Sequence, residues 1–590
     1  MNEAPDPSKR LHALLASAWA WEMREFPERA TWAGVPGHDR RWSDRSRAAI
    51  EKRRGDLQGQ LAQARALPRE ALSPADRLNL DLFVRETETS LEEMRWPGEC
   101  LCLTQMDGVH QDPAQVLSLM GGMAARGLED VVARLEALPL LMDQCTALLR
   151  EGLAKRVTPP KICLRDVPRQ IENLCVKDAE KSPLLAAFAK APAGGAAARF
   201  EELKKDAAAL FTQKIVPALQ ALAEFVEKSY VPGARETTAW SALPDGEAWY
   251  AFRVREQTTT NLTPKEIHAI GLDEVKRIRS RMDAIVREAG FGGDFAKYCD
   301  HLRTERSFYF ETPAALLAAY RELCKRIDPE LVKLFGKLPR LPYGIAEVPA
   351  FSAESQTTAY YLPGSPEAAR PGLFYANTSK LDSRPRWEME ALSLHEAVPG
   401  HHLQIALAQE MALPDFRRHA GYNAYIEGWA LYSEALGYDI GLYRDLHGQF
   451  GQLSYEMWRA IRLVVDTGMH ALGWSREKAI EYFAGNTGKP LHDITVEIDR
   501  YLVWPAQALS YKLGELEIRK LRREAEAALG ARLDLRAFHD ELLGEGALPL
   551  DVLAERMRAW VAGEQARAAP ETTRSRSRVP RRRSGRPRGA

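Results

Sequence analysis

Three histidines and a glutamate lie within eight residues in the segment HEAVPGHH at 395–402. A zinc hydrolase needs two or three imidazole or carboxylate ligands, an open metal position for water, and a carboxylate that takes a proton from that water. In the HExxH pattern, two histidines four residues apart share one helix face, and the glutamate between them is the general base. His395 and Glu396 begin this pattern, but Pro399 stands where the second histidine belongs.

A straight helix cannot bring the later histidines to a metal beside His395. Around the helix axis, His401 lies roughly 120° away from His395, whereas His402 shares its face but lies roughly 10 Å further along. Pro399 cannot donate a helical hydrogen bond, and Gly400 follows it, so we expect a kink or bulge at this pair. This deformation predicts that His395 shares a metal with one of the two later histidines.

A neighbouring helix is expected to supply the third ligand. The segment YIEGWALYSE at 425–434 offers two glutamates seven residues apart on one helix face. We favour Glu427 as the ligand, because the adjacent Gly428 permits close packing against the motif helix. Glu434 would then orient a ligating histidine from behind, and Glu396 would face the open coordination position.

A further helix carries a polar stripe whose members lie within about 60° of one another around the axis. The stripe consists of Arg459, Arg462, Asp466 and His470. Burying it is costly unless it faces a polar cleft. We therefore expect an arginine to bind a substrate carboxylate and His470 to stabilise the oxyanion of a carbonyl under attack. An exposed face with an Arg462–Asp466 ion pair is the alternative.

Two tyrosines follow this stripe, near the Pro505 break in the next helical segment. Tyr501 or Tyr511 would donate a hydrogen bond to the transition state, although buried tyrosines are commonly structural. Upstream, residues 339–378 are rich in Pro, Gly, Tyr and Thr. Extended pieces at 357–362 and 373–377 predict a small β ribbon or sheet before the motif helix, and a strand there would hold an extended peptide. Tyr360 and Asn377 are the candidate substrate-binding residues of this segment.

The rest of the chain predicts a mainly α, large multi-helix fold of two lobes with a deep central cleft. We place an N-terminal helical lobe at about 8–260 and a metal-site lobe at about 261–563. Thr263 and Pro264 mark a helix start. Further helices are expected at about 313–326, 387–411, 422–438, 450–472, 475–484, 493–528 and 550–563.

The composition is that of a soluble protein, with 45% hydrophobic and 27% charged residues. No segment approaches the roughly 20 apolar residues of a membrane span. The formal net charge of 0 conceals a basic tail, since residues 570–590 carry eight Arg and one Glu. We expect disorder from 564 to 590, because this tail has little apolar surface to bury. A solvated tail is favoured over contact with nucleic acid.

The seven cysteines indicate a reducing, cytoplasmic location. Their number is odd, and all of them precede the histidine segment, so they predict neither a disulfide framework nor paired zinc thiolates. The start of the chain resembles a signal peptide, since Lys9 and Arg10 precede the apolar stretch from Leu11 to Trp21. The apolar periodicity continues past Trp21, however, which is typical of a first helix of the fold.

Several segments together resemble the bacterial domain-of-unknown-function 885 (DUF885) family, from about Leu11 to Trp560. They are HEAVPGHHLQ at 395–404, EGWALYSE at 427–434, RLVVDTGMHALGWS at 462–475, RYLVWPAQALSYKLGELEI at 500–518, GLFYANTS at 372–379 and LPDGEAWYAFRVREQTTTNLTPKEIHAIGLDEV at 243–275. The family's helical architecture is similar to zinc peptidases of the neurolysin and angiotensin-converting-enzyme type. That resemblance implies one zinc ion in an interhelical cleft, with a glutamate ligand from a following helix; the spacing from His395 to His401 departs from it.

The sequence therefore predicts a zinc hydrolase, in first place a peptidase of short peptides. His395, His401 or His402, and Glu427 would bind zinc, and Glu396 would take the proton from water. A small-molecule amide hydrolase and a non-catalytic, metal-stabilised binding protein are the alternatives. A di-iron oxidase would need Glu-x-x-His pairs on two helices, and none occurs at these positions. The scissile bond, exo- or endo-cleavage, the physiological metal and the oligomeric state stay open.

Overall fold

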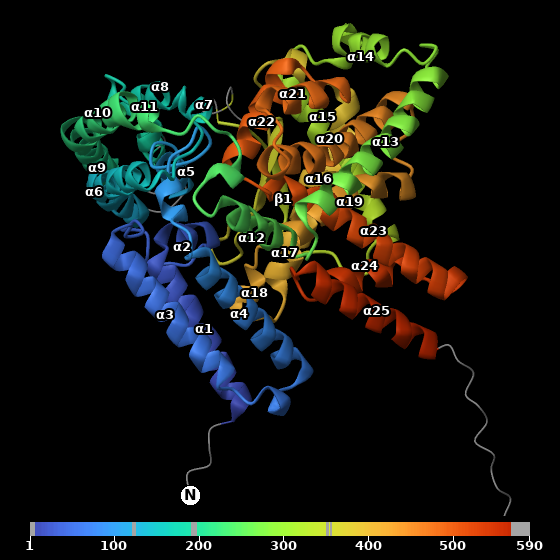
Figure 1. Ribbon diagram of the computed structural model, residues 1–590, viewed down its shortest axis with the longest axis horizontal. Helices are drawn as coiled ribbons and strands as arrows, with labels where there is room; N and C mark the ends of the chain where they lie inside the picture. The colour runs from blue at the N-terminus through green and yellow to red at the C-terminus, as the bar shows by residue number, and fades with distance from the viewer. Residues whose placement is uncertain are drawn as a thin grey trace, which may run out of the picture.

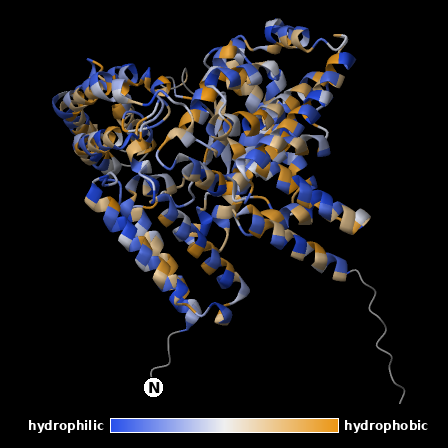
Figure 2. Ribbon diagram, in the orientation of Figure 1, coloured by the Kyte–Doolittle hydropathy of each residue, from blue (hydrophilic) through white to orange (hydrophobic). Residues whose placement is uncertain are grey.

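Helices dominate the structure because apolar residues recur at helical spacing through most of the chain. The computed structural model describes residues 6–120, 125–189, 191, 197–349, 353 and 357–567. Hydrophobic and hydrophilic positions alternate around the helices (Figure 2), and the predicted mainly α fold is confirmed. The last helix runs to Arg567, so the start of the predicted tail is helical; the Arg-rich remainder lies outside the described residues.

The first part of the chain forms two groups of helices (Figure 1), as the predicted helical character of this part requires. The first group contains α1 (Pro7–Glu25), α2 (Pro27–Ala33), α3 (Arg47–Arg65) and α4 (Pro74–Glu93). The second contains α5 (Asp112–Met120), α6 (Ala125–Lys155), α7 (Lys161–Leu164), α8 (Val167–Glu172), α9 (Ala197–Leu210), α10 (Val216–Phe225) and α11 (Val231–Gly233).

The remaining helices surround the histidine segment. They are α12 (Gly246–Thr258), α13 (Pro264–Glu288), α14 (Phe295–Thr304), α15 (Pro313–Ile327), α16 (Met389–Glu396), α17 (His401–Glu410), α18 (Asp415–Arg418), α19 (Asn423–Asp439), α20 (Leu446–Ala471), α21 (Arg476–Gly485), α22 (Leu491–Val503), α23 (Ser510–Leu529), α24 (Leu535–Leu543) and α25 (Leu550–Arg567). The helix start at Thr263 is a capping box, in which Thr263 and Glu266 satisfy each other's backbone N–H. The single helix expected at 493–528 is wrong, since the chain breaks around Pro505 into α22 and α23.

A three-stranded sheet precedes the motif helices, as the extended pieces predicted. Its strands are β1 (Tyr343–Glu347), β2 (Ala359–Leu362) and β3 (Gly372–Ala376), in the order β1-β3-β2. β3 pairs parallel with β1 and antiparallel with β2. β2 and β3 are the two predicted pieces, whereas β1 was not singled out by the sequence. The sheet leaves β2 as an edge strand.

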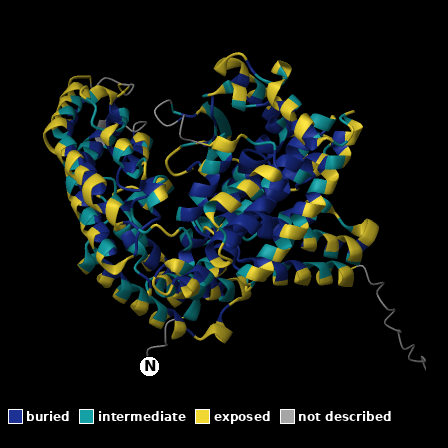
Figure 3. Ribbon diagram, turned by 45° about the horizontal axis from the view of Figure 1, so that its top comes forward, coloured by how far each residue is buried: buried dark blue, intermediate teal, exposed yellow. Residues whose placement is uncertain are grey.

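Buried apolar residues gather in clusters that do not follow the chain order. One cluster joins side chains of α1 and α4 with those of α15 to α19 and α23 to α25. A second is confined to residues 103–234, and a third unites α13, α14 and α20 to α22. Figure 3 shows the buried residues in the interior and the exposed ones along the outer helices. The lobe boundary at about residue 260 stays a prediction.

A large cavity of about 1420 Å³ opens among α1, α4, α12, α19, α23 and α25. Its lining mixes acidic and basic side chains, among them Glu86, Glu256 and Arg523, and none of the predicted metal ligands belongs to it. The cleft expected over the histidine segment is therefore not this cavity. Among the described residues, no helix is both long enough and apolar enough to cross a membrane.

Two glycines allow α19 and α23 to meet backbone to backbone. A Cβ atom on Gly428 would lie 2.5 Å from the Cα of Gly514, and one on Gly514 would lie 1.8 Å from the carbonyl oxygen of Ala424. The expectation that Gly428 packs against the motif helix is wrong, since its near neighbour is α23. The close contact of these glycines fixes the position of α19 against α23. α19 is the helix that carries the two candidate glutamates.

We predict that Gly514→Ala lowers the free energy of unfolding by roughly 1–3 kcal/mol or more, because the added methyl group must displace the backbone of α19. Gly59→Ala is the matched control, as its Cβ would meet open space within α3. That control should be neutral or slightly stabilising. Thermal unfolding midpoints measure both, and equal midpoints for the two variants would contradict the close packing.

Candidate metal centre

The motif helix breaks where Pro399 and Gly400 predicted. α16 ends at Glu396 and α17 begins at His401, with non-helical backbone angles at Ala397 (φ −96°, ψ −109°) and Gly400 (φ −71°, ψ −130°). Gly400 passes so close to the preceding helix that a Cβ atom there would lie 1.9 Å from the His395 carbonyl oxygen. Only glycine fits this position without moving the backbone. The break removes the 120° offset that a straight helix imposes.

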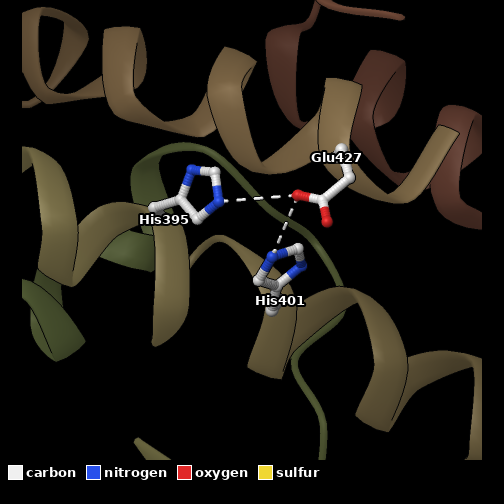
Figure 4. A group of neighbouring side chains, drawn as sticks. All are labelled: His395, His401 and Glu427. Carbon is white, nitrogen blue, oxygen red and sulfur yellow. Dashed lines mark ion pairs between the residues drawn. The ribbon is translucent and has the colours of Figure 1, made fainter. Parts of the chain in front are cut away.

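His395, His401 and Glu427 converge at one point (Figure 4). Their candidate ligand atoms all lie within 4.8 Å of one another. Oε2 of Glu427 is 3.7 Å from Nε2 of His395 and 3.5 Å from Nε2 of His401. The imidazole rings stand nearly perpendicular, at 88°, with centroids 4.9 Å apart. Two nitrogen atoms and one oxygen atom therefore face a common space.

These separations fit a shared metal better than hydrogen bonds. Protein N–H···O hydrogen bonds have donor–acceptor distances of about 2.7–3.2 Å. Two ligands of one tetrahedral zinc ion, each about 2.0–2.1 Å from the metal, are about 3.3 Å apart. The observed 3.5 and 3.7 Å lie just above this separation. Two imidazoles with one carboxylate is a donor set of catalytic zinc sites, which keep a fourth position open.

The Glu427 carboxylate also lacks the partners that burial demands. Its Oε2 atom is buried and accepts no hydrogen bond from a described residue. Burial disfavours charge on both groups, but the contact with Glu427 and then with Glu434 raises the pKa of His395 to about 9. The same contacts with His395 and His401 hold the pKa of Glu427 well below its usual range, against its burial. A cation between these three groups would satisfy the orphaned oxygen.

Glu434 supports the site from behind. It is fully buried, and its Oε1 lies 2.8 Å from Nδ1 of His395, which leaves Nε2 of that ring directed at Glu427. A carboxylate on the far nitrogen fixes the tautomer and orientation of a ligating imidazole. The structure thus places Glu434 where the sequence interpretation put it.

Glu396 ends α16 beside His395 and is 9% exposed. Among the described residues, its carboxylate has no hydrogen bond or ion pair, although it helps electrostatically to raise the pKa of His395. A carboxylate without a fixed partner, adjacent to a candidate ligand, is available to accept a proton.

His402 turns away from this point. It is buried, its Nδ1 lies 2.9 Å from the hydroxyl of Tyr361, and its ring lies 4.7 Å from that of Tyr343. Burial lowers its pKa to about 4. His402 therefore anchors α17 to the sheet. Of the two later histidines, it is His401 that lies beside His395 and Glu427.

The polar stripe of α20 is buried, so the exposed-face alternative is wrong. Its residues do not share one site, because Asp466 and His470 contact a different part of the protein from Arg459 and Arg462. His470 is fully buried; its Nε2 donates to the carbonyl of Tyr501 and its Nδ1 accepts from the backbone N–H of Trp240. Asp466 accepts from the hydroxyl of Tyr250 and from the N–H of Ala506. Both residues hold the connection between α22 and α23. His470 is thus not positioned to stabilise an oxyanion.

Of the two tyrosines, Tyr501 is fully engaged. Its hydroxyl donates to Glu497 and accepts from Arg462 and Trp458, at 2.6, 2.8 and 3.1 Å. This network leaves no free donor for substrate, so the role predicted for Tyr501 is wrong. Tyr511 lies beside the candidate centre instead, with its ring 6.4 Å from that of His395.

Two further candidates support the sheet. Tyr360 on β2 stacks on Tyr375 of β3, at 4.9 Å between ring centroids. The Asn377 amide donates to the carbonyl oxygens of Ala353 and Thr357 and thereby ties together the connections around β2 and β3. Neither residue has a described contact with the histidine group, so a substrate-binding role for them gains no support.

Sequence reasoning missed the bond that fixes the break against α19. The indole Nε1 of Trp429 donates to the carbonyl of Pro399 at 2.8 Å. Trp429 follows Glu427 by two residues, so this bond fixes the position of the Glu427 carboxylate relative to the helix break. The indole N–H of a buried tryptophan requires a hydrogen-bond acceptor. The position of Trp429 in an apolar helix could therefore have predicted such a bond, although not its acceptor.

Comparison with known proteins identifies the family. The family described as "Bacterial protein of unknown function (DUF885)" matches residues 27–557, and the chain belongs to it. Two solved structures, each named a "putative lipoprotein", are similar. The one from Colwellia psychrerythraea has a TM-score of 0.90 and 28% identity, covering 95% of this chain and 100% of its own. The one from Shewanella oneidensis, of unknown function, has a TM-score of 0.67 and 18% identity, covering 94% and 100%. No curated protein matches the sequence.

We predict that His470 makes the fold sensitive to acid. Burial lowers its folded-state pKa to about 4, below the unfolded value near 6.5. Its contribution is therefore complete above about pH 6.5 and is lost as the pH falls toward 4, by at most about 3 kcal/mol. His470→Gln keeps one donor and one acceptor but does not titrate. The thermal unfolding midpoint of His470→Gln should lie below that of wild type at neutral pH, and this difference should shrink below about pH 6. The control His492→Gln, at an exposed position, should match wild type at each pH. A difference for His470→Gln that does not change with pH would contradict the prediction.

Proposed function

We propose that this DUF885 protein is a zinc-dependent peptidase that hydrolyses short peptides. The observation that carries the proposal is the convergence of His395, His401 and Glu427 on the unpaired, buried Oε2 atom of Glu427. The adjacent Glu396 supplies a carboxylate without a described partner. A relation in mechanism to neurolysin-type and angiotensin-converting-enzyme-type peptidases is part of the proposal.

The three converging residues would hold the zinc ion. When bound, zinc supplies a Lewis acid that polarises a carbonyl group and lowers the pKa of water. Glu434 keeps Nδ1 of His395 occupied, so that Nε2 would be the nitrogen left to bind the metal. Gly400 and Trp429 hold the helix break that sets the distance between the two histidines.

Glu396 would act as general base and then as general acid. It takes one proton from the attacking water as the water oxygen bonds to the carbonyl carbon of the peptide. It returns that proton to the amide nitrogen as the C–N bond breaks, which releases one carboxylic acid and one amine. One water molecule is consumed, and Glu396 ends in its starting state.

Tyr511 would stabilise the oxygen atom that gains charge in this reaction. Its ring lies beside His395, and Nε2 of Gln507 lies 3.5 Å from its hydroxyl oxygen. With Gln507 as donor, the phenolic proton of Tyr511 is free for substrate. Tyr511 thus keeps the role that the sequence interpretation gave it, without the His470 donor expected beside it.

A reducing, cytoplasmic location is also proposed, because all seven cysteines are free. Lipid attachment is the alternative, as the two structural neighbours carry a lipoprotein name. No nucleic-acid or membrane partner is proposed.

The proposal is tested on zinc content and peptide cleavage together. Wild type should bind one zinc ion per chain, measured by elemental analysis, and cleave members of a short-peptide library. His401→Gln should lose the metal, whereas the matched His402→Gln should keep it. Glu396→Gln should keep zinc but cleave about 10²- to 10⁴-fold more slowly.

Full zinc occupancy in His401→Gln would overturn the ligand assignment. Undiminished cleavage by Glu396→Gln would remove the general base from the mechanism. Stoichiometric zinc in a wild-type protein that cleaves nothing would instead favour a metal-stabilised binding protein.

A separate prediction concerns Glu434. Glu434→Gln preserves the shape of the side chain but weakens its hold on Nδ1 of His395. We expect zinc affinity to fall about 10- to 100-fold, as measured by competition with a chelator. Because Glu434 is fully buried, the thermal unfolding midpoint of the metal-free variant serves as the control for folding. Unchanged affinity in a folded variant would show that Glu434 does not orient the ligand.

A further inference from the structure

Two arginines of α20 surround the ring of Tyr511. The guanidinium carbon Cζ of Arg462 lies 4.4 Å from the ring centroid and that of Arg459 lies 5.8 Å from it. Both side chains are buried, at 6% exposure for Arg459 and 3% for Arg462. The ring of His395 also lies beside Tyr511, with centroids 6.4 Å apart. Tyr511 therefore neighbours both the candidate metal centre and a buried cationic pair.

Both guanidinium groups have donors that remain unpaired. Nε of Arg459 and Nη1 of Arg462 are buried and have no hydrogen-bond partner among the described residues. The other donors of Arg462 are used, since Nε bonds to the hydroxyl of Tyr501 and Nη2 to Glu497. A buried, unsatisfied donor on a charged group costs about 1–3 kcal/mol or more. Such donors beside a catalytic centre indicate a ligand position.

The charge around these donors is positive. Arg500 joins the pair near Tyr511 and contacts the same Glu497 carboxylate, at 3.5 Å. Glu434 lies 3.8 Å from Nη2 of Arg459 but is already held by His395. Three arginines thus share two carboxylates, Glu497 and Glu434, and each carboxylate already has another partner. An anionic ligand would balance the remaining positive charge.

We propose that Arg462 and Arg459 bind the free C-terminal carboxylate of the substrate, so that the protein is an exopeptidase that trims peptides from the C-terminus. The inference rests on the proposed peptidase function. A guanidinium fork matches the planar geometry of a carboxylate. Cζ of Arg462 and the ring of His395 both lie within 6.4 Å of the Tyr511 ring centroid. A carboxylate on Arg462 would therefore lie within about three extended residues of the metal ligands, at about 3.3–3.6 Å per residue. The substrate would keep only its last few residues beyond the scissile bond.

The experiment measures binding rather than turnover. N-acetylated trialanine and its C-terminal amide are titrated calorimetrically into the metal-free full-length protein. Wild type should bind the acid about 10- to 100-fold more tightly than the amide. Arg462→Lys, which keeps the charge but loses the fork, should lose most of this preference.

Arg417→Lys is the matched control. Arg417 is equally buried, at 1% exposure, but bonds to Asn79 and to the carbonyl of Glu545, away from Tyr511. It should keep the acid preference. Circular dichroism establishes folding, and Arg459→Lys provides the same readout if Arg462→Lys does not fold.

Equal binding of acid and amide by wild type, or no binding of either, overturns the carboxylate site. A full acid preference in folded Arg462→Lys overturns the assignment to that residue. The two proposals fail separately: acid preference without cleavage by the zinc-loaded protein removes the peptidase, whereas equal cleavage of acid and amide removes only the carboxylate site.

Discussion

The rest of the site depends on the interruption of one helix between Glu396 and His401. A continuous helix would hold the two histidines roughly 120° apart, on faces that no single ion can reach. The break is stabilised from both sides, since Gly400 lies against the carbonyl of His395 and Trp429 donates to Pro399. The second contact comes from α19, two residues from Glu427. One local distortion thus aligns both histidines with each other and with the carboxylate that completes the group.

Burial then decides how these groups can be satisfied. Glu427 and Glu434 face His395 from opposite sides, but Glu434 makes a 2.8 Å hydrogen bond, whereas Glu427 stands 3.7 Å away. A buried carboxylate at the longer distance keeps an unpaired oxygen, which is costly unless a cation or proton lies between. The arrangement is therefore asymmetric: one carboxylate orients the ring, and the other leaves room for a metal.

Much of this arrangement follows from local rules that a sequence displays. Helix periodicity predicted the mainly α fold, Thr263 with Pro264 predicted the start of α13, and Pro399 with Gly400 predicted the break. Choices that depend on contacts between distant segments could not be predicted. Whether His401 or His402 joins His395 is decided by Tyr361 and Tyr343, which draw His402 to the sheet. Likewise, Gly428 has a small-residue partner on α23, which the sequence of α19 alone does not reveal.

The α20 stripe shows why angular periodicity is insufficient for assigning a shared role. Arg459 and His470 lie on the same helix face, and both are buried, as a stripe facing polar groups requires. At 1.5 Å per residue, however, they are roughly 16 Å apart along the axis. That length exceeds the reach of one reacting carbonyl, so the two ends must serve different neighbours. The end at Arg459 lies near Glu434 and Tyr511, while the end at His470 holds Trp240 and the backbone of α22. Position around a helix predicts which residues face inward; position along it decides which of them can act on the same atom.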